Sequence, residues 1–338
     1  MTKTKLVNLA LQGGGAHGAF TWGVLERLLQ EPRFEIEGVS ATSAGAINAV
    51  VLAHGLTVGG REGAINALAD FWDRVLRLAR TSPLQPSWFD RLIHNHGLEY
   101  SPGYFFFDML SRIFSPYQLN PFNYNPLKEI LEEVVDFEGL RRQSAVKIFL
   151  SATNVRTGKI RVFSGDELSV ASVLASSCLP LLSQAIEIEG DYFWDGGYMG
   201  NPALFPLIYG CKSCDVLIVH INPTERLEIP KTAPEIINRI NEISFNSSLF
   251  REMRAIAFVG NLIDDGTVTD ANLKRMLLHS IEADDVMQGL GPISQLNADG
   301  RFLMHLHDIG QNSAERWLET NLNMIGTKST VDIRARYL

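Results

Sequence analysis

The chain has 338 residues, 46% of them hydrophobic, which is enough for a sizeable core in one large domain or two ordinary ones. A formal net charge of −8 argues against nucleic acid as a partner and against simple electrostatic adhesion to anionic membranes. No hydrophobic run approaches the roughly 18 residues of a membrane-spanning helix, and the first residues lack the long apolar region of a signal peptide. We therefore expect a cytoplasmic protein whose contact with the inner face of the membrane is at most transient and peripheral.

Alternating strands and helices are predicted over the first 55 residues. The apolar run at 6–12 predicts a buried strand that ends in glycines, and residues 16–30 have the helical spacing of apolar side chains. Residues 34–42 predict a second strand, and the small-residue run 43–55 predicts a helix with Gly55 near its end. This order is typical of a parallel sheet with helices on its faces.

Residues 81–125 break this alternation. The segment contains five prolines and eleven aromatic residues, so we expect an inserted lobe over the sheet. Three cysteines, Cys178, Cys211 and Cys214, are too few for a disulfide framework, and no second cysteine pair completes a zinc site with the CKSC pattern. Strand patterns resume at 146–153, 159–163, 185–197 and 215–223, and the chain becomes helical from about residue 230.

The run GGGAHG, Gly13 to Gly18, lies between the first strand and the first helix. Consecutive glycines allow several N–H groups to point at one spot near a helix N-terminus, which suits a phosphate or the oxyanion of acyl transfer. A dinucleotide site would need an acidic residue at the end of the next strand. Glu35 and Glu37 stand at its start instead, so only the loop itself supports a nucleotide-binding module.

Ser43 follows the second strand and precedes a helix, in the sequence ATSAG. Hydrolases expose a nucleophilic serine on such a turn, usually written G-x-S-x-G. Ala41 replaces the first glycine, whereas Gly45 is kept, so we expect the turn to survive. A serine here also suits the start of a helix as a cap, and this role does not exclude catalysis.

Asp195 ends an apolar run and is followed by Gly196 and Gly197. An aspartate before glycines is often only a turn residue. A serine nucleophile needs a base, however, and no histidine is obviously placed to serve. A desolvated aspartate can accept the serine proton directly when burial raises its pKa. The histidines are His17, His54, His94, His96, His220, His279, His305 and His307.

The three motifs occur in an order that resembles the patatin-like phospholipase family. The segments SATNVRTGKIRVFSGD, ASSCLPLL and IEGDYFWDGGYMGNPA also resemble the family around its aspartate. The resemblance covers roughly residues 5–225, which it implies to be the catalytic domain, with the lobe at about 81–125 inserted. Residues 226–338 resemble the helical C-terminal extension of a bacterial branch, packed on that domain.

Members of that family hydrolyse acyl esters of lipids with a Ser–Asp dyad. Carried over to this chain, the resemblance implies Ser43 as nucleophile, Asp195 as base and the amides of Gly13, Gly14 and Gly15 as oxyanion donors. It also implies a three-layer α/β/α fold with a central, mostly parallel sheet, an acyl-enzyme intermediate, a lipid or acyl-ester substrate, and no metal or organic cofactor. His17 stands where many relatives carry arginine, so a positive charge there would depend on pH. The supporting motif residues are Ala16, His17, Gly18, Ala41, Gly45, Gly196 and Gly197.

Two other interpretations are open. One is an α/β-hydrolase with a Ser–Asp–His triad that uses His220 or a later histidine. The other is a catalytically idle lipid-binding or scaffold protein, for which Ala41 is the one hint. The aromatic lobe has two interpretations as well: its rings form the core of the lobe, or they line an acyl-chain pocket or touch the bilayer, in which case the lobe acts as a lid.

Overall fold

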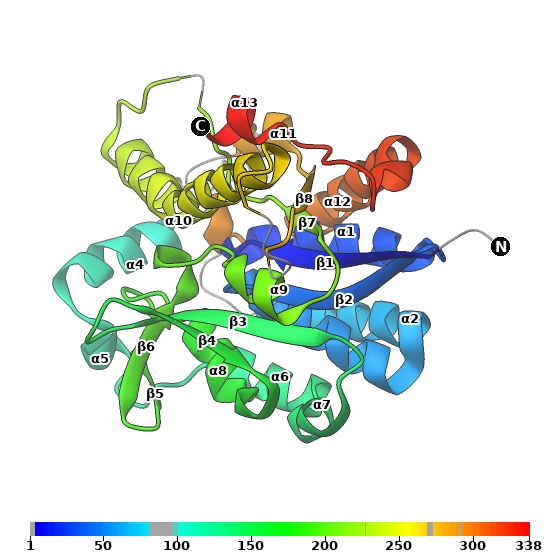
Figure 1. The fold of residues 1–338 in the computed structure, drawn as a ribbon. Helices are drawn as coiled ribbons and strands as arrows, with labels where there is room; N and C mark the ends of the chain where they lie inside the picture. Colours follow the sequence, from blue (N-terminus) through cyan, green and yellow to red (C-terminus); the bar gives the residue numbers. More distant parts are fainter. Residues whose placement is uncertain (1–3, 81–97, 99–100, 227, 269–272, 291–292) are drawn as a thin grey trace.

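An eight-stranded mixed sheet forms the centre of the computed structural model (Figure 1), which describes residues 4–80, 98, 101–226, 228–268, 273–290 and 293–338. Pairings β1–β2, β2–β3, β1–β7 and β7–β8 are parallel, whereas β4, β5 and β6 run antiparallel to their neighbours. The strands are β1 (Lys5–Leu11), β2 (Phe34–Ala41), β3 (Lys147–Asn154), β4 (Ile160–Ser164), β5 (Ile186–Ile188), β6 (Asp191–Asp195), β7 (Asp215–Val219) and β8 (Leu277–Ile281).

Helices cover both faces of the sheet, because its central strands are apolar on both sides. In β1, Leu9 and Leu11 face one core, and Ala10 between them faces the other. The first core is closed by α1 (Gly18–Gln30), α2 (Ala44–Ala79), α6 (Pro126–Val134), α7 (Phe137–Gln143), α8 (Val170–Ser176) and α12 (Gly300–Asn321). The second is closed by α9 (Phe205–Gly210), α10 (Ala233–Asp264) and α13 (Ile333–Tyr337), and the remaining helices are α4 (Pro102–Ile113), α5 (Pro116–Leu119) and α11 (Asp284–Gly289). The predicted fold class, a mostly parallel sheet between helical layers, is confirmed.

The C-terminal part of the chain is built into both layers and the sheet. Strand β8 pairs with β7 and was not predicted from the sequence, because LLHSI is short and lies between long helical segments. Helix α12 packs on α1 with backbone in direct contact. A Cβ added to Gly23 would lie 1.9 Å from the carbonyl oxygen of His307, and one on Gly310 would lie 2.1 Å from that of Phe20. The crossing therefore requires a glycine on each helix.

Helix α2 consists of two arms. The first arm ends at a break at Gly59 and Gly60, whose backbone angles are not helical, so Gly55 lies near its end as predicted. The second arm, which continues to Ala79, was not predicted. The two arms pack together so closely that a Cβ on Gly55 would lie 2.4 Å from the Cα of Ala64, so the small residues of this segment also serve helix packing.

Part of the predicted lobe, residues 81–97 and 99–100, lies outside the described residues. The part described contains α4, α5 and the residues up to 125, and most of the aromatic side chains described there are exposed. Phe105 is 70% exposed, Tyr117 56% and Phe122 93%, so these three rings do not form the core of a lobe. In the described part of the chain, no helix combines the length and the apolar character needed to cross a bilayer.

Candidate active site

Ser43 occupies a strained turn between β2 and α2. Its φ and ψ angles are +56° and −124°, a backbone conformation that few residues other than glycine adopt. The helix that follows starts so close to β1 that a Cβ on Gly45 would lie 2.5 Å from the carbonyl oxygen of Leu11. Ala41 stands within β2, fully buried, and does not carry the strain. The sharp turn therefore forms with alanine in that position and depends on Gly45.

The glycine loop touches Ser43 directly. A Cβ on Gly13 would lie 2.5 Å from the Cβ of Ser43, so only glycine fits there. The Gly13 N–H donates to Oδ1 of Asn201 at 2.7 Å and is therefore already used. Within the described residues, the N–H groups of Gly14 and Gly15 have no hydrogen-bond partner. Two of the three predicted donors are thus available to a bound oxyanion.

Strand β3 brings Asp195 to the end of β2. Strand β2 pairs with the first half of β3 and β6 with the second half, while β4 overlaps both. Because β4 occupies one edge of β3, β2 and β6 must follow one another along the other edge. Ala41 pairs with Leu150, and Asp195 pairs with Ala152, two residues further along. The ends of β2 and β6 therefore point at each other.

The residue after Asp195 has no room for a side chain. A Cβ on Gly196 would lie 2.1 Å from the carbonyl oxygen of Ser151 and 3.0 Å from Cγ2 of Thr42. The backbone amide of Ser43 itself is held by Oγ of Ser176 at 3.0 Å. These contacts fix the two motifs relative to each other.

The Asp195 carboxyl is completely buried, and burial raises its pKa to about 6. The Gly197 N–H donates to Oδ1 at 2.7 Å and, together with the nearby Ser43 hydroxyl, moderates that rise. The other oxygen, Oδ2, has no hydrogen-bond partner among the described residues. An unpartnered, desolvated carboxylate oxygen beside a serine hydroxyl can accept its proton.

Three of the described histidines form hydrogen bonds with residues other than Ser43 and Asp195. Nε2 of His220 lies 2.8 Å from the hydroxyl of Tyr337, and Nε2 of His307 lies 2.9 Å from Glu26. His17 is buried against Ser294, and burial lowers its pKa to about 4, so it is neutral at pH 7. His94 and His96 lie outside the described residues. Among the described residues, no histidine is hydrogen-bonded to Asp195, so none completes a Ser–Asp–His triad there.

Four buried carboxamides surround the glycine loop and were not singled out from the sequence. Asn222 Nδ2 donates to the carbonyl oxygen of Gly13 at 2.6 Å, and Asn201 accepts the N–H of the same residue. Gln12 accepts the backbone N–H groups of residues 221 and 222 and donates to Oδ1 of Asn246 at 3.2 Å. Asparagine and glutamine far apart in the sequence give no local pattern, although Asn201 does follow the DGG motif closely.

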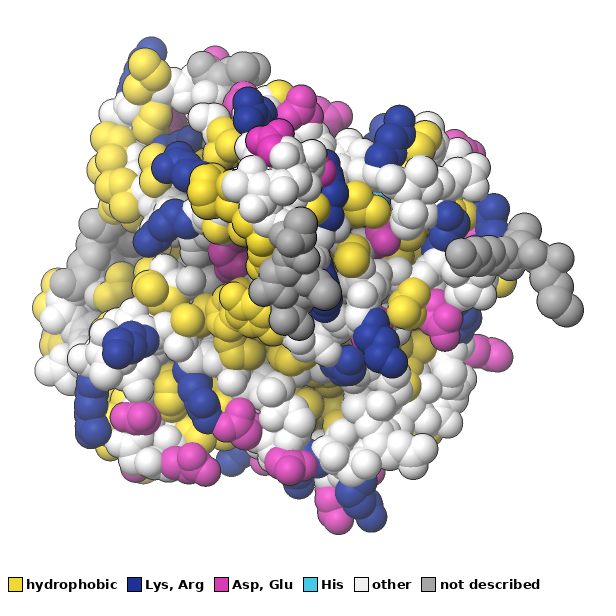
Figure 2. Space-filling view, in the orientation of Figure 1, with side chains coloured by type: hydrophobic (Ala, Val, Ile, Leu, Met, Phe, Trp, Pro, Cys, Tyr) yellow, Lys and Arg dark blue, Asp and Glu magenta, His cyan; other side chains and the backbone are white. Residues whose placement is uncertain are grey.

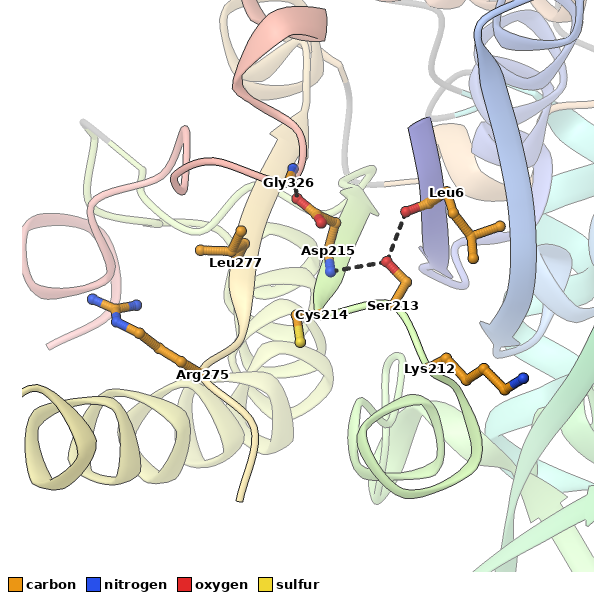
Figure 3. Close-up of a pocket in the computed structure, with 8 residues that line it drawn as sticks. All are labelled: Leu6, Lys212, Ser213, Cys214, Asp215, Arg275, Leu277 and Gly326. Carbon is orange, nitrogen blue, oxygen red and sulfur yellow. Dashed lines mark hydrogen bonds between the residues drawn. The ribbon is translucent and has the colours of Figure 1, made fainter. Parts of the chain in front are cut away.

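The pocket in Figure 3 lies at the opposite edge of the sheet, where β1, β7 and β8 begin. Ser213 donates to the carbonyl oxygen of Leu6, and Asp215 accepts the Gly326 N–H at 2.7 Å. Cys214 of the CKSC pattern lines this pocket, whereas Cys211 is buried with its pKa raised to about 11. Among the described residues, no group of histidine, cysteine and acidic side chains could hold a metal ion.

Comparison with protein families identifies the fold. The family model described as patatin-like phospholipase matches residues 9–208, more than half of the chain. The chain belongs to the patatin-like phospholipase family. This membership places it among lipid acyl hydrolases, and the matched span contains the glycine loop, Ser43 and Asp195. A comparison with curated proteins gave no match.

Two solved structures resemble this patatin-like protein at low identity. VipD from Legionella pneumophila is 16% identical with a TM-score of 0.40, over 93% of this chain and 67% of VipD. The ExoU–SpcU complex from the type III secretion system of Pseudomonas aeruginosa is 15% identical with a TM-score of 0.31, over 99% of this chain and 75% of the matched one.

Proposed function

We propose that the protein is a phospholipase A or lysophospholipase-like esterase that uses Ser43 as nucleophile and Asp195 as base. The observation that carries the proposal is a fully buried, partly unpartnered carboxyl next to a serine in a strained turn. Strain of this kind is found at functional sites, where it presents a side chain in one orientation. Membership of the family supplies the substrate class, an acyl ester of a lipid.

In the first step Asp195 takes the proton of the Ser43 hydroxyl as the oxygen attacks the ester carbonyl carbon. The carbonyl oxygen gains the negative charge and accepts hydrogen bonds from the N–H groups of Gly14 and Gly15. The C–O bond to the alcohol then breaks, and the proton held by Asp195 goes to the leaving alkoxide. The product of this step is an acyl ester on Ser43.

In the second step a water molecule takes the place of the alcohol. Asp195 accepts one of its protons, and the resulting hydroxide attacks the acyl carbon through the same oxyanion site. The bond to Ser43 breaks, its oxygen recovers the proton, and a fatty acid leaves. Gly13 has a positioning role, because its amide is engaged with Asn201.

The oxyanion site is formed by amides alone. His17, which occupies the position of an arginine in many relatives, has a pKa of about 4 and carries no charge at pH 7. Arg226 further disfavours the protonated ring. Replacing His17 with an apolar residue of similar size therefore leaves the pH dependence of turnover unchanged.

Hydrolysis of a p-nitrophenyl acyl ester series by the wild type, Ser43→Ala and Asp195→Asn tests the dyad. Both variants should lose activity by about three orders of magnitude or more. Asp191→Asn is the matched control, because this carboxyl lies on the same strand and is half exposed. Activity that survives Ser43→Ala overturns the mechanism.

A fluorophosphonate probe separates an enzyme from an idle scaffold of the same fold. The probe should label the wild type at Ser43 and fail to label Ser43→Ala. An unlabelled, folded wild type would favour the scaffold interpretation. The triad interpretation requires that His220→Ala, His305→Ala or His307→Ala abolish labelling, whereas the dyad predicts that all three variants are labelled.

A further inference from the structure

Helix α10 has an inner face that packs on the loops of the proposed site. Oδ1 of Asn246 accepts from Gln12, and Oγ of Ser248 accepts the Asn201 N–H at 3.2 Å. Phe245 packs edge-to-face on Tyr198, three residues after Asp195. One helix diameter, about 10 Å, therefore separates the outer face of α10 from these loops.

The outer face of α10 carries exposed apolar side chains over most of its length. Ile236, Ile240 and Ile243 are 42%, 59% and 55% exposed, and Phe258 is 62% exposed. These positions are four, three and then fifteen residues apart, so all four fall on one side of an α-helix. In Figure 2 hydrophobic side chains gather at the upper left, where Figure 1 places the N-terminal half of α10.

Two arginines complete this face. Arg251 and Arg254 stand between the isoleucines and Phe258 on the same side of the helix. Arg251 is hydrogen-bonded to Ser247 and to no carboxylate, and Arg254 has no ion-pair partner among the described residues. The face is therefore both apolar and positively charged.

The carboxylates of α10 are turned away from this face. Between the first and last turns the helix contains two, Glu242 and Glu252. Glu242 is buried and paired with Arg226 and Arg239, and Glu252 accepts the backbone N–H groups that begin α9. A chain with a net charge of −8 thus presents a 28-residue stretch of α10, from residue 236 to 263, with no carboxylate on its outer face.

We propose that the outer face of α10, defined by Ile236, Ile240, Ile243, Arg251 and Arg254 with Phe258, is a docking surface for anionic phospholipid. Apolar side chains flanked by arginines match the acyl boundary and the charged headgroups of such a surface. A second copy of this chain fits less well, because the face offers no carboxylate to the arginines of a partner. Docking to lipid does not depend on the proposed hydrolysis. A role of this docking in delivering substrate to Ser43 does rest on the proposed function.

Sedimentation with vesicles tests the surface without measuring hydrolysis. The wild type should bind vesicles that contain phosphatidylglycerol, bind phosphatidylcholine vesicles far less, and release the former as salt rises. Arg254→Glu should weaken binding about twenty-five-fold, because it changes the charge by two units and each unit contributes about fivefold, whereas Arg254→Lys should retain binding. Ile240→Ser should weaken binding about tenfold.

The controls are exposed residues on other faces. Val58→Ser, on α2, and Lys328→Glu, near the C-terminus, should bind as the wild type does. Ser43→Ala should also bind normally, so loss of hydrolysis leaves the docking result interpretable. Equal binding to both kinds of vesicle, unchanged binding by Arg254→Glu, or a dimer that Ile240→Ser dissociates would each overturn the proposal.

Discussion

Acidification should switch off hydrolysis near pH 6, because the proposed base must be ionised. Burial raises the pKa of Asp195 from its ordinary value of 3.8 to about 6. At pH 5 about one tenth of the carboxyl is then ionised, against more than about nine tenths for an ordinary aspartate. The wild-type kcat/KM should therefore fall about tenfold between pH 7 and pH 5.

The assay is kcat/KM on a short, soluble p-nitrophenyl ester, followed at a wavelength insensitive to ionisation of the product. This parameter reports ionisation of the free enzyme, the state in which the Asp195 carboxyl is completely buried. Thermal unfolding at each pH confirms that the protein remains folded. A kcat/KM that stays constant down to pH 5 would refute the reasoning, because it would require an ordinary carboxyl or a different base.

The same burial has a consequence for stability. Since the folded-state pKa of Asp195 lies above its unfolded value, this group stabilises the fold most below pH 3.8, and that contribution is lost as pH rises through 6. The total loss is about 3 kcal/mol at most. Asp195→Asn has no such pH dependence, so its stability relative to the wild type should improve by about 1 kcal/mol from pH 5 to pH 8. Denaturant unfolding at both pH values measures this, and an equal difference at both would contradict it.

Three further results are expected. Gly45→Ala should destabilise the fold by about 2 kcal/mol or more, because its methyl group would meet the carbonyl oxygen of Leu11, whereas Gly59→Ala, with open space around it, should change the melting temperature little. Asn201→Leu removes the bond that holds the Gly13 amide, and with it the glycine loop, in position, so kcat should fall about tenfold to a hundredfold with KM nearly unchanged. Asn201→Asp keeps an acceptor for that amide and should restore part of the rate. A change in KM alone would point to a role in binding. Turnover should be higher on micellar than on monomeric ester if the exposed rings of α4 and α5 meet lipid, and equal turnover would count against this.

The local features of the site were predictable from the sequence. An apolar run followed by glycines or by Ser43 indicates where a parallel strand ends, and the ends of parallel strands lie at one edge of a sheet. Strand patterns of this kind predicted the fold class and every strand except β8, and the order of the three motifs resembled the family that the family match confirms. The sequence pattern also singled out Ala41 in place of the usual glycine. This replacement does not prevent the sharp turn, because the strained backbone angles are at Ser43.

Long-range pairing was not predictable in the same way. That β6 follows β2 along one edge of β3 depends on two pairings, β2 with β3 more than a hundred residues away and β3 with β6 about forty residues away, and no local pattern encodes their register. The bond between Asn201 and Gly13 spans 188 residues and is likewise invisible to periodicity. The low acidity of the outer face of α10 was hidden because a net charge averages over the whole surface.

The crossing of α1 and α12 at Gly23 and Gly310 affects the order in which the protein can be completed during synthesis. Helix α1 begins directly after the glycine loop, yet α12, which covers it, is translated long after the family-matched residues 9–208. Until β8 is made, β7 has an unpaired edge, and until α12 is made, the surface of α1 at Gly23 is uncovered. Both surfaces invite association with other chains. Synthesis of the family-matched segment alone therefore leaves the layer over α1 incomplete.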